Sequence, residues 1–504
     1  MKNLFELLAE VNYLRLTAPP EVEITGVAYD SRKVERGNLF ACLPGQRTDG
    51  HLYIGDALAR GAAAILVQSG RTPEGQDFGA ATVVEVEDTR GVLAAVSSAF
   101  YDYPSRELCI VGITGTNGKT TTSYLTDAIL RHAGFSAGVI GTLGYRTGDE
   151  LLPAAHTTPE APDLQSLLRR MVAAGVTHAA MEVSSHALAL RRSDNCAFSF
   201  AVFTNLTRDH MDFHADPRDY LEAKARLFYD PVFAPRNRLR INVINADDRY
   251  GRVLVERAVG LTVTYGIEGR GDIMARDVAL SADGTSFRVE APQGVLPVNL
   301  QLVGSFNVYN ALAALAVALG VGVELDQAVA ALESVAPIRG RFERVEAGQD
   351  YAVVVDYSHT PDGLEKALRD ARRLVPGRLL VVFGAGGDRD PGKRPLMGEI
   401  AARLADVVFV TSDNPRSEPP ERIVKQIMAG VPWASRRRCR VEPDRRQAIR
   451  EALNEARAED LVLIAGKGHE TSQILADRTI HFDDREVVGE IVAERRQGVG
   501  EQSV

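Results

Sequence analysis

Short apolar runs separated by turn residues dominate the first hundred residues of the chain. Runs of this kind, bounded by Gly, Pro, Asn or Asp, are typical of β-strands. They lie at residues 22–28, 38–43, 63–67 and 82–86. Acids interrupt the apolar positions of residues 1–10, which predicts an amphipathic helix there and no signal peptide. Turn residues around Pro104 predict a linker that ends this part of the chain.

Strand-like and helix-like patterns alternate from there to about residue 336. Such alternation predicts a parallel sheet whose strands are connected by crossover helices. Residues 262–299 break the alternation with short strand-like runs, so we expect an antiparallel insertion in this segment.

The last third of the chain repeats one design four times. Each apolar, β-rich run is followed at once by a polar loop that carries Gly or Pro. The runs lie at residues 351–355, 379–383, 407–410 and 461–464. In open α/β sheets the ligand crevice lies outside the carboxyl ends of the strands. The four loops are therefore expected to converge on one site.

A glycine-rich segment lies between a strand-like run at 108–111 and a helix-like run that ends near residue 134. It comprises Gly115, Thr116, Asn117, Gly118, Lys119, Thr120 and Thr121. Glycines let backbone N–H groups close around phosphate oxygens, and the following helix N-terminus adds positive potential. Lys119 can reach the terminal phosphates, and the Thr120 hydroxyl can ligate Mg²⁺. The segment predicts ATP binding, although Ile113 stands where the strict P-loop pattern has its first glycine.

These patterns together predict an α/β protein with three domains. We expect a small α/β domain at 1–104, a central P-loop-like ATPase domain with a parallel sheet at 105–336, and a Rossmann-like domain at 337–504. The composition, 45% hydrophobic and 25% charged, is that of a globular protein. No apolar run reaches the roughly 18 residues of a membrane span.

Charge and cysteine usage narrow the possible partners and the compartment. The net charge of −9 argues against general nucleic-acid binding, and the basic run 436–438 is predicted to be solvated surface. The four cysteines lie far apart without a Cys-x-x-Cys pair, which suggests neither a zinc site nor a disulfide framework. We expect a cytoplasmic protein.

Chemistry-bearing side chains also follow two strand-like runs of the middle segment. Glu182 ends the run 176–181, where a nucleotide-binding sheet normally carries a Mg²⁺-binding acid, and His210 follows the run 198–203. Mg²⁺ prefers oxygen ligands, so from the pattern alone His210 could be a ligand or a structural residue. Lys224 lies in a helical stretch whose pattern predicts a surface lysine.

Six motifs of the chain, taken together, resemble the Mur ligases, the ATP-dependent amino-acid ligases of peptidoglycan precursor synthesis. The motifs span 115–121, 182–186, 204–210, 304–310, 340–343 and 356–362. The early Asp30-Ser31-Arg32 segment is similar to the UDP-binding domain of those members that join a diamino acid to UDP-N-acetylmuramoyl-L-alanyl-D-glutamate. The resemblance covers essentially the whole chain and implies an enzyme that uses ATP and Mg²⁺.

The resemblance also implies residue roles. Besides residues 115–121, Asn307, Arg341, Asp356 and His359 match the nucleotide site. Thr120, Glu182, His210 and a carbamylated Lys224 match the magnesium ligands, and Lys119, Lys224, His210 and Glu182 match catalytic positions. Ser31, Thr157, Thr158, Ser184 and Arg192 match the site of the UDP-linked dipeptide.

A carbamate on the lysine is physically sensible if it faces the metals. An unmodified ammonium about 4 Å from a cation would be repelled by roughly 4 kcal/mol per unit charge at an effective dielectric near 20. Leu190 departs from the family pattern, since some relatives carry Gln there, and it removes a polar contact to the substrate.

The loop after the run 407–410 bears on which amino acid is added. Asp413, Asn414, Pro415 and Arg416 resemble the signature of the meso-diaminopimelate-adding members, and Arg389, Gly466 and Glu470 match further residues of that pocket. An arginine fork can pair with the second carboxylate of diaminopimelate, which lysine lacks. Lysine would leave that guanidinium desolvated, and sites built for a polar group reject analogues without it.

The expected reaction is phosphorylation of the D-glutamyl side-chain carboxylate by ATP, followed by attack of the diaminopimelate amine on the acyl phosphate. We expect a monomer with no nucleic-acid partner. Three alternatives stay open: a lysine-adding ligase of the same step, a folylpolyglutamate synthetase-like ligase, and a scaffold that binds ATP without ligating anything. The segment around Ser31 argues against the second of these.

Overall fold

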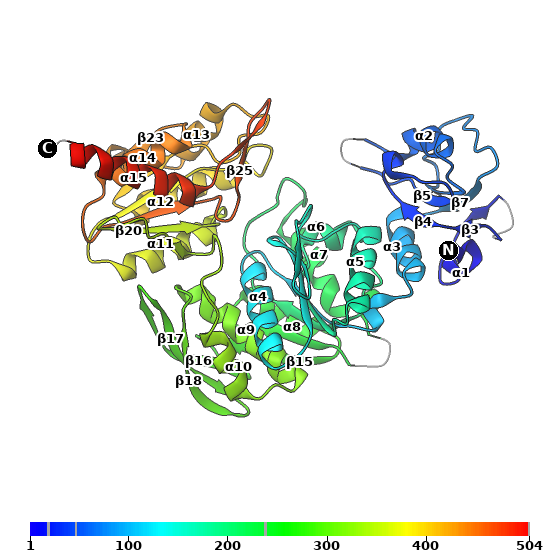
Figure 1. Ribbon diagram of the computed structural model, residues 1–504, viewed down its shortest axis with the longest axis horizontal. Helices are drawn as coiled ribbons and strands as arrows, with labels where there is room; N and C mark the ends of the chain where they lie inside the picture. Colours follow the sequence, from blue (N-terminus) through cyan, green and yellow to red (C-terminus); the bar gives the residue numbers. More distant parts are fainter. Residues whose placement is uncertain (18–20, 46–47, 236–238, 502–504) are drawn as a thin grey trace.

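Three mixed sheets organise the molecule into three lobes (Figure 1). The computed structural model describes residues 1–17, 21–45, 48–235 and 239–501. The N-terminal and C-terminal lobes lie on opposite sides of the view, and each contacts the central lobe. The predicted α/β class with three domains agrees with this architecture, while the boundaries at 104 and 336 stay predictions.

The N-terminal lobe has a five-stranded sheet in the order β2-β7-β6-β5-β4. Its strands are β2 (Arg15–Leu16), β4 (Gly26–Ala28), β5 (Asn38–Ala41), β6 (Ala64–Gln68) and β7 (Thr82–Val86). Helices α2 (Ile54–Ala59) and α3 (Thr89–Phe100) accompany it. The strand-like run at 22–28 is divided, because β3 (Glu23–Ile24) pairs with β1 (Lys2–Asn3) in a separate ribbon.

The helix predicted for residues 1–10 is much shorter than expected. Only α1 (Leu4–Leu7) is helical, because Asn3 caps it by accepting a bond from the Phe5 N–H and residues 2–3 are drawn into the ribbon with β3. The helix still buries an apolar face, which comprises Leu4 and Leu7.

The central lobe has an eleven-stranded sheet in the order β11-β10-β9-β12-β8-β13-β14-β15-β16-β17-β18. Its core strands are β8 (Cys109–Thr114), β9 (Ala137–Gly141), β12 (His178–Glu182), β13 (Phe198–Phe203), β14 (Ile241–Asn245) and β15 (Leu261–Gly266). The edges are β10 (Gly144–Thr147), β11 (Glu150–Leu152), β16 (Ile273–Ser281), β17 (Gly284–Ala291) and β18 (Gly294–Leu300). Strands β8 and β12 run parallel, with Glu182 beside Ile113, so their carboxyl ends meet at one edge.

The antiparallel insertion expected at 262–299 is correct for β16, β17 and β18 and wrong for β15. That strand pairs parallel with β14, with Val263 opposite Val243. Tyr265 explains the difference, since its ring is fully buried and its hydroxyl donates to the Phe203 carbonyl. The strand therefore contributes to the main core and extends the parallel part of the sheet.

Helices cover both faces of the central sheet (Figure 1). One group packs in the core with α4 (Lys119–His132), α9 (Ser305–Val321) and α10 (Leu325–Glu333). The other comprises α5 (Ala161–Ala173), α6 (Ser185–Ala189), α7 (Pro217–Tyr229) and α8 (Arg249–Arg257). Small buried residues such as Ala311 and Ala314 let α9 approach α4, which brings its N-terminal turn to the glycine-rich loop.

The C-terminal lobe has a six-stranded sheet in the order β19-β20-β24-β21-β22-β23. Its strands are β19 (Glu343–Arg344), β20 (Ala352–Asp356), β21 (Leu379–Phe383), β22 (Val407–Val410), β23 (Cys439–Val441) and β24 (Leu461–Ala465). Five of them run parallel, and only β19 is antiparallel to its neighbour. The four predicted strands of this segment therefore end at one edge.

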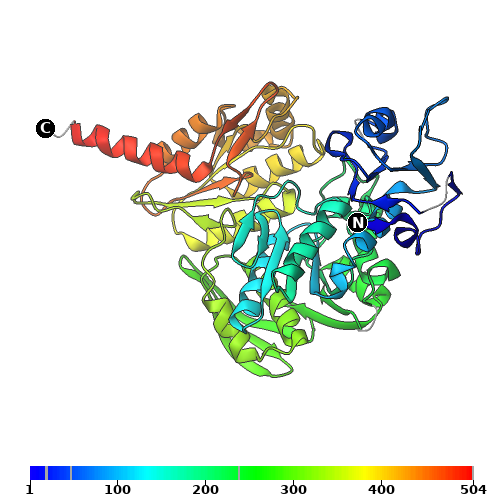
Figure 2. The ribbon, with the colours of Figure 1, turned by 45° about the vertical axis from the view of Figure 1, so that its right-hand side comes forward.

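Helices also cover both faces of this sheet. They are α11 (Pro361–Leu374), α12 (Lys393–Leu404) and α13 (Pro420–Ala429) on one side, and α14 (Arg445–Glu455) and α15 (Asp484–Glu501) on the other. Figure 2 shows α15 ending on the side of the molecule away from the N-terminal lobe. A hairpin of β25 (Ser472–Ile474) and β26 (Thr479–His481) completes the lobe.

Short 3₁₀ helices occur at η1 (Ser31–Lys33), η2 (Gly50–Tyr53), η3 (Pro104–Arg106), η4 (Pro231–Phe233) and η5 (Trp433–Arg438). The basic run at 436–438 is exposed, as predicted for a solvated surface. Among the residues that the structure describes, no helix combines the length and apolarity needed to cross a membrane.

A fully buried ion pair connects α14 to α15 near the carboxyl end of β24. Arg445 donates from Nε and Nη2 to the two Asp484 oxygens, both at 2.7 Å. Neither side chain is exposed. We expect Arg445→Ala to lower the free energy of unfolding of this lobe by about 3–5 kcal/mol, because Asp484 is left buried without its cation. Denaturant unfolding followed by circular dichroism would measure this loss.

Arg450 provides the control, since it joins the same two helices through a more exposed pair with Glu494. Arg450→Ala should cost less than about 1 kcal/mol. Equal losses in the two variants would contradict the stabilising role assigned to the buried pair.

Candidate functional site

A cavity of about 760 Å³ lies between the central and C-terminal lobes, beside the carboxyl ends of the parallel strands of both sheets. Many of the residues singled out from the sequence line it. They are residues 116–121, Thr157, Thr158, Glu182, Ser184, Arg192, His210, Arg341, Asp356, His359 and Arg389. Gly115, Lys224 and Asn307 lie behind its walls, and Ser31 lies in the N-terminal lobe.

The glycine-rich loop runs from the end of β8 to the start of α4, as the sequence predicts. Gly115 has φ +149°, and a Cβ atom there would stand 1.9 Å from the Thr204 hydroxyl oxygen. Gly118 has φ +90°, and a Cβ atom there would stand 2.4 Å from the Asn310 Oδ1 atom. Both positions require glycine, because a side chain would clash and φ lies in the region that glycine alone adopts easily.

Two lysines converge beneath this loop. Lys119 Nζ donates to the carbonyl oxygens of Gly115 and Thr116, each at 2.9 Å. Lys224 Nζ donates to the same Gly115 oxygen at 2.9 Å and lies 4.7 Å from the centre of the Tyr220 ring. The surface position predicted for Lys224 from its helical pattern is therefore wrong. The buried face of α7 includes this side chain, which is 1% exposed.

Burial acts on both ammonium groups, and repulsion by Lys119 acts on Lys224 as well. Burial lowers the pKa of Lys119, against the attraction of Glu182 and Asp209. Burial and the neighbouring Lys119 hold the pKa of Lys224 well below its usual value. Lys224 is therefore poised to exist as a neutral amine, the form that can act as a nucleophile.

Oxygen ligands suited to Mg²⁺ meet at the start of α4. The Thr120 hydroxyl donates to Glu182 Oε2 at 3.0 Å, and Glu182 also accepts from the Thr142 N–H at 2.8 Å. Mg²⁺ is typically held by one or two protein oxygens together with substrate phosphates, which fits this pair beside the phosphate loop. Arg341 reaches the same point from the C-terminal lobe, with Nη2 donating to the Thr120 hydroxyl at 2.8 Å.

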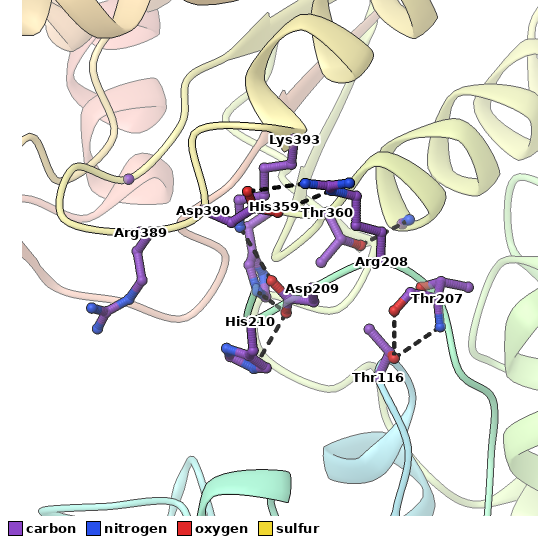
Figure 3. A network of polar contacts seen from close by, with 12 residues as sticks. Thr116, Thr207, Arg208, Asp209, His210, His359, Thr360, Arg389, Asp390 and Lys393 are labelled. Atoms are coloured by element: carbon purple, nitrogen blue, oxygen red, sulfur yellow. Dashed lines mark hydrogen bonds and ion pairs between the residues drawn. The ribbon is translucent and has the colours of Figure 1, made fainter. Parts of the chain in front are cut away.

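His210 lines the same cavity and contacts Asp209 (Figure 3). Its Nε2 atom lies 3.3 Å from Asp209 Oδ2, and its ring meets the His186 ring edge-on at 4.7 Å. Burial lowers the pKa of His210 to about 3, so the ring is neutral and can accept as well as donate. Over the described residues, no three His, Cys, Asp or Glu side chains are grouped as metal ligands. Those residue types do not include Thr120 or Lys224, so the set of four magnesium ligands stays a prediction.

The residues matched to the nucleotide divide between wall and support. Asn307 is fully buried, donates to the Val303 carbonyl at 2.9 Å and accepts from Asn310. Asp356 accepts from the Phe342 N–H at 2.7 Å and thereby fixes the segment that carries Arg341. Asn307 therefore supports the site from behind, whereas Asp356, Asn310 and Arg341 line the cavity itself.

Four of the five residues matched to the dipeptide line one side of the cavity: Thr157, Thr158, Ser184 and Arg192. The Thr158 hydroxyl donates to the Glu182 carbonyl at 2.9 Å and accepts from the Ser184 N–H at 3.1 Å. Arg192 Nε lies 2.8 Å from Glu160, and Thr157 contacts the Thr142 hydroxyl. This wall extends toward the N-terminal lobe.

Ser31 lies in η1 of the N-terminal lobe, outside the cavity wall. Its neighbourhood is connected to the wall through Tyr29, whose hydroxyl donates to Asp163 at 2.5 Å.

The four C-terminal loops converge, as expected from the strand ends. Asn414 Nδ2 donates to Glu470 Oε2 at 2.7 Å, and Arg416 Nη1 donates to the Gly387 carbonyl at 2.8 Å. Pro415 packs against Gly387, where a Cβ atom would stand 1.8 Å from its carbonyl oxygen. Of the seven residues matched to the amino acid, Arg389 lines the cavity and the other six are not among its lining residues.

Two of the residues matched to the amino acid, Arg416 and Gly466, have unusual backbone conformations. Arg416 has φ +53°, a strained conformation that clusters at functional sites. Burial and the neighbouring Arg389 lower the pKa of Arg416, so two guanidinium groups lie close together. Gly466 has φ +119°, and a Cβ atom there would stand 2.6 Å from Asp413 Oδ2, which makes room for that carboxylate.

Sequence reasoning missed several residues of the cavity. Asp247 follows the end of β14, accepts from the Ile267 N–H at 2.6 Å and accepts from the Tyr309 hydroxyl at 3.0 Å. Its signal was available, since residues 245–248 are another polar segment after a buried strand. Asp209 stood beside the predicted His210. Lys393 does not line the cavity but pairs with Asp209, and it had no local signal because that partner lies in a different lobe.

Three family models match the chain. They are described as the Mur ligase middle domain (residues 113–318), the Mur ligase glutamate ligase domain (340–468) and the Mur ligase family catalytic domain (23–101). Together they cover more than half of the sequence.

Curated relatives match over almost their full length. The UDP-N-acetylmuramoyl-L-alanyl-D-glutamate–2,6-diaminopimelate ligase of Caldanaerobacter subterraneus subsp. tengcongensis is 44% identical over 97% of this chain and 99% of its own. The protein of the same name from Gloeobacter violaceus is 46% identical over 98% of both chains.

Solved structures agree with this likeness. A structure titled as UDP-N-acetylmuramoyl-L-alanyl-D-glutamate–2,6-diaminopimelate ligase is 33% identical, with a TM-score of 0.68 over 98% of this chain and 99% of its own. A folylpolyglutamate synthase from Mycobacterium tuberculosis, 19% identical with a TM-score of 0.61 over 75% of this chain and 92% of its own, shares the fold alone. On the strength of the family models and the full-length relatives, the chain belongs to the Mur ligase family.

Proposed function

We propose that this chain joins meso-2,6-diaminopimelate to the D-glutamyl side-chain carboxylate of UDP-N-acetylmuramoyl-L-alanyl-D-glutamate, with hydrolysis of ATP, in peptidoglycan precursor synthesis. The observation that carries the proposal is the single cavity. Its walls hold the phosphate loop with Lys119, the segment of Thr158 and Arg192, and Arg389 from the opposite lobe. Nucleotide, acceptor carboxylate and incoming amine can therefore meet in one place.

The reaction proceeds in two steps. A carboxylate oxygen of the D-glutamyl group attacks the γ-phosphorus of ATP, and ADP leaves. The amine nitrogen of diaminopimelate then attacks the acyl carbon, the tetrahedral intermediate collapses with loss of phosphate, and the amine gives up a proton. The protein forms no covalent bond to substrate, so catalysis comes from positioning and from stabilisation of developing charge.

Lys119 and Arg341 supply most of the local positive charge from protein side chains. Lys119 lies under the phosphate loop, and Arg341 approaches Thr120 from the other lobe. Thr120 and Glu182 would hold Mg²⁺, which neutralises phosphate charge and orients the transferring group when bound. His210 and a modified Lys224 complete the proposed metal site, with reorientation of His210 from Asp209.

Lys224 is proposed to carry a carbamate. Two ammonium groups that share the Gly115 carbonyl oxygen repel each other, and the lowered pKa of Lys224 provides a neutral amine. The nitrogen attacks the carbon of CO₂, an N–C bond forms, and one proton is released. The carboxylate product would then attract Lys119 and the metal instead of repelling them.

The residues matched to the amino acid favour diaminopimelate over lysine. Arg389 and Arg416 can pair with the distal carboxylate, and Glu470 with the distal ammonium, leaving fewer buried groups without partners. We also propose the domain limits 1–104, 105–336 and 337–504, with roles in binding UDP, ATP and the amino acid. The location in the cytoplasm and the monomeric state stay predictions.

The first test compares amino acids. Phosphate release in the presence of ATP, Mg²⁺ and the UDP-linked dipeptide should require an amino acid, and meso-diaminopimelate should exceed L-lysine by at least about a hundredfold in kcat/KM, because lysine leaves buried guanidinium groups without an anion. Preference for lysine would identify the lysine-adding alternative. ATP binding without any ligation would support the scaffold alternative.

The second test concerns the phosphate loop. Gly115→Ala should weaken ATP binding at least about tenfold, equivalent to 1.4 kcal/mol, since its methyl group would displace Thr204 and the loop with it. Isothermal titration calorimetry would measure the dissociation constant. Gly134→Ala is the control, because Gly134 also has a positive φ, of +87°, lies at the other end of α4, and has nothing within 4 Å of its Cβ position.

The third test addresses the carbamate. Lys224→Ala should abolish ligation, and a small carboxylic acid added to the assay should restore part of it by replacing the missing carboxylate. Nuclear magnetic resonance with ¹³C-bicarbonate should show a carbamate signal in the unsubstituted protein that Lys224→Ala lacks. Full activity of the alanine variant would refute the modification.

A further inference from the structure

The loop that carries Arg389 is anchored from two different lobes. On one side of Arg389, residues 387 and 388 are held by their own lobe. The Gly387 N–H donates to the Asn414 carbonyl at 2.9 Å, and the Asp388 N–H donates to Glu418 Oε1 at 2.7 Å. Arg416 adds a further bond to the Gly387 carbonyl.

On the other side of Arg389, the loop is held by the central lobe. Arg208 donates two hydrogen bonds to the Asp390 carboxylate, from Nε at 3.0 Å and from Nη2 at 3.3 Å. The next residue, Asp209, lies 3.4 Å from Lys393 Nζ and 3.6 Å from His359 Nε2. Arg208 and Asp209 together with Asp390 and Lys393 are called the interlobe clamp below (Figure 3).

The buried charges of the clamp can fix the position of residues 390–393 relative to the central lobe. Three of its members, Asp209, Asp390 and Lys393, are at most 4% exposed, so their charges are shielded from water and depend on one another. Gly392 allows the close approach, because a Cβ atom there would stand 2.3 Å from Arg208 Nη2. Its backbone is otherwise ordinary, with φ −68°.

The members of the clamp from the central lobe, Arg208 and Asp209, follow a residue that is hydrogen-bonded to the phosphate loop. Thr207, which precedes Arg208, exchanges two bonds with Thr116: its N–H donates to the Thr116 hydroxyl at 3.0 Å, and that hydroxyl lies 3.2 Å from the Thr207 carbonyl. Residues 204–210 therefore connect the phosphate loop directly to the loop of Arg389. Arg389 projects from that loop away from the clamp (Figure 3) and lines the cavity.

We propose that the interlobe clamp positions Arg389, so that the binding site for the incoming amino acid is complete only while the central lobe holds Asp390 and Lys393. Arg208 and Asp390 are positioning residues in this scheme, since they act through Arg389. The proposal rests on the proposed function for the identity of the amino acid. The contact between the lobes can be tested independently of that identity.

The kinetic test uses Asp390→Asn and Arg208→Ala in the full chain. Each should raise the KM for meso-diaminopimelate about tenfold, while the KM values for ATP and the UDP-linked dipeptide stay within about twofold. In a double-mutant cycle the two effects should be non-additive, because both remove the same contact. The exchanged pair Arg208→Asp with Asp390→Arg should recover part of the lost affinity.

Two further variants separate the clamp from general damage. Gly392→Ala keeps every charge but obstructs the Arg208 guanidinium, so it should raise the same KM. Glu494 accepts from Arg450 Nη1 at 2.6 Å within the C-terminal lobe, and neither residue lines the cavity. Glu494→Gln should therefore leave all three KM values unchanged. Equal increases in all three KM values, additive effects in the cycle, or an unchanged KM for the amino acid would each overturn the proposal.

Amide hydrogen exchange distinguishes failure of the clamp from failure of the proposed function. In the substrate-free protein, Asp390→Asn should speed exchange in both segments 206–210 and 386–393, and Glu494→Gln should not. If the unsubstituted protein ligates nothing, the proposed function fails, and this measurement alone decides the clamp. Unchanged exchange in both segments would show that the contact does not hold the loop and would overturn the proposal.

Discussion

The packing of the glycine-rich loop against residues 204–210 is the contact on which the site depends. Gly115 can carry no side chain because Thr204 occupies that space, and Thr116 is bonded to Thr207. Strands β8 and β13 are parallel neighbours, so their carboxyl ends deliver these two loops side by side. The phosphate grip at Lys119 and the segment that reaches the opposite lobe are thus one backbone unit.

Concentrated positive charge is the second constraint. The chain has a net charge of −9, yet Lys119, Lys224 and Arg341 gather near one loop, and Arg389 lies beside Arg416. Burying a cation is costly without a partner, and protein carboxylates satisfy only part of this cluster. Phosphates and substrate carboxylates are the anions that complete it. Ligand binding and the approach of the two lobes should therefore favour each other.

Local patterns predicted the parts of this protein that follow from the geometry of a single strand or loop. The phosphate loop, the strand ends at Glu182 and His210, and the convergence of the C-terminal loops all follow from the rule that parallel strands end at one edge. The seven residues matched to the amino acid came instead from family resemblance. The sequence pattern could not tell which of them line the cavity. Only the folded chain shows that Arg389 lines it and that Arg416 does not.

The failures share a physical cause, which is a partner distant in sequence. Lys224 reads as a surface residue on its helix, but the Gly115 carbonyl and the Tyr220 ring enclose it. Strand β15 reads as part of an insertion, but the core around Tyr265 draws it into the parallel sheet. No periodicity reports such contacts, because each depends on how separate elements pack.

Several polar bonds connect the central and C-terminal lobes beside the cavity. Each lobe has its own apolar clusters, and the contacts between the central and C-terminal lobes include both apolar packing by Val303 and Phe306 and polar bonds. Besides the interlobe clamp, Asn117 donates to Asp362 at 3.1 Å, and the Ser305 N–H donates to Asp370 at 2.7 Å. Polar interfaces exchange their bonds for water at modest cost, as expected for domains that move relative to one another. A ligase of this design needs such an interface, because the cavity must open to admit three substrates and close to keep water from an acyl phosphate.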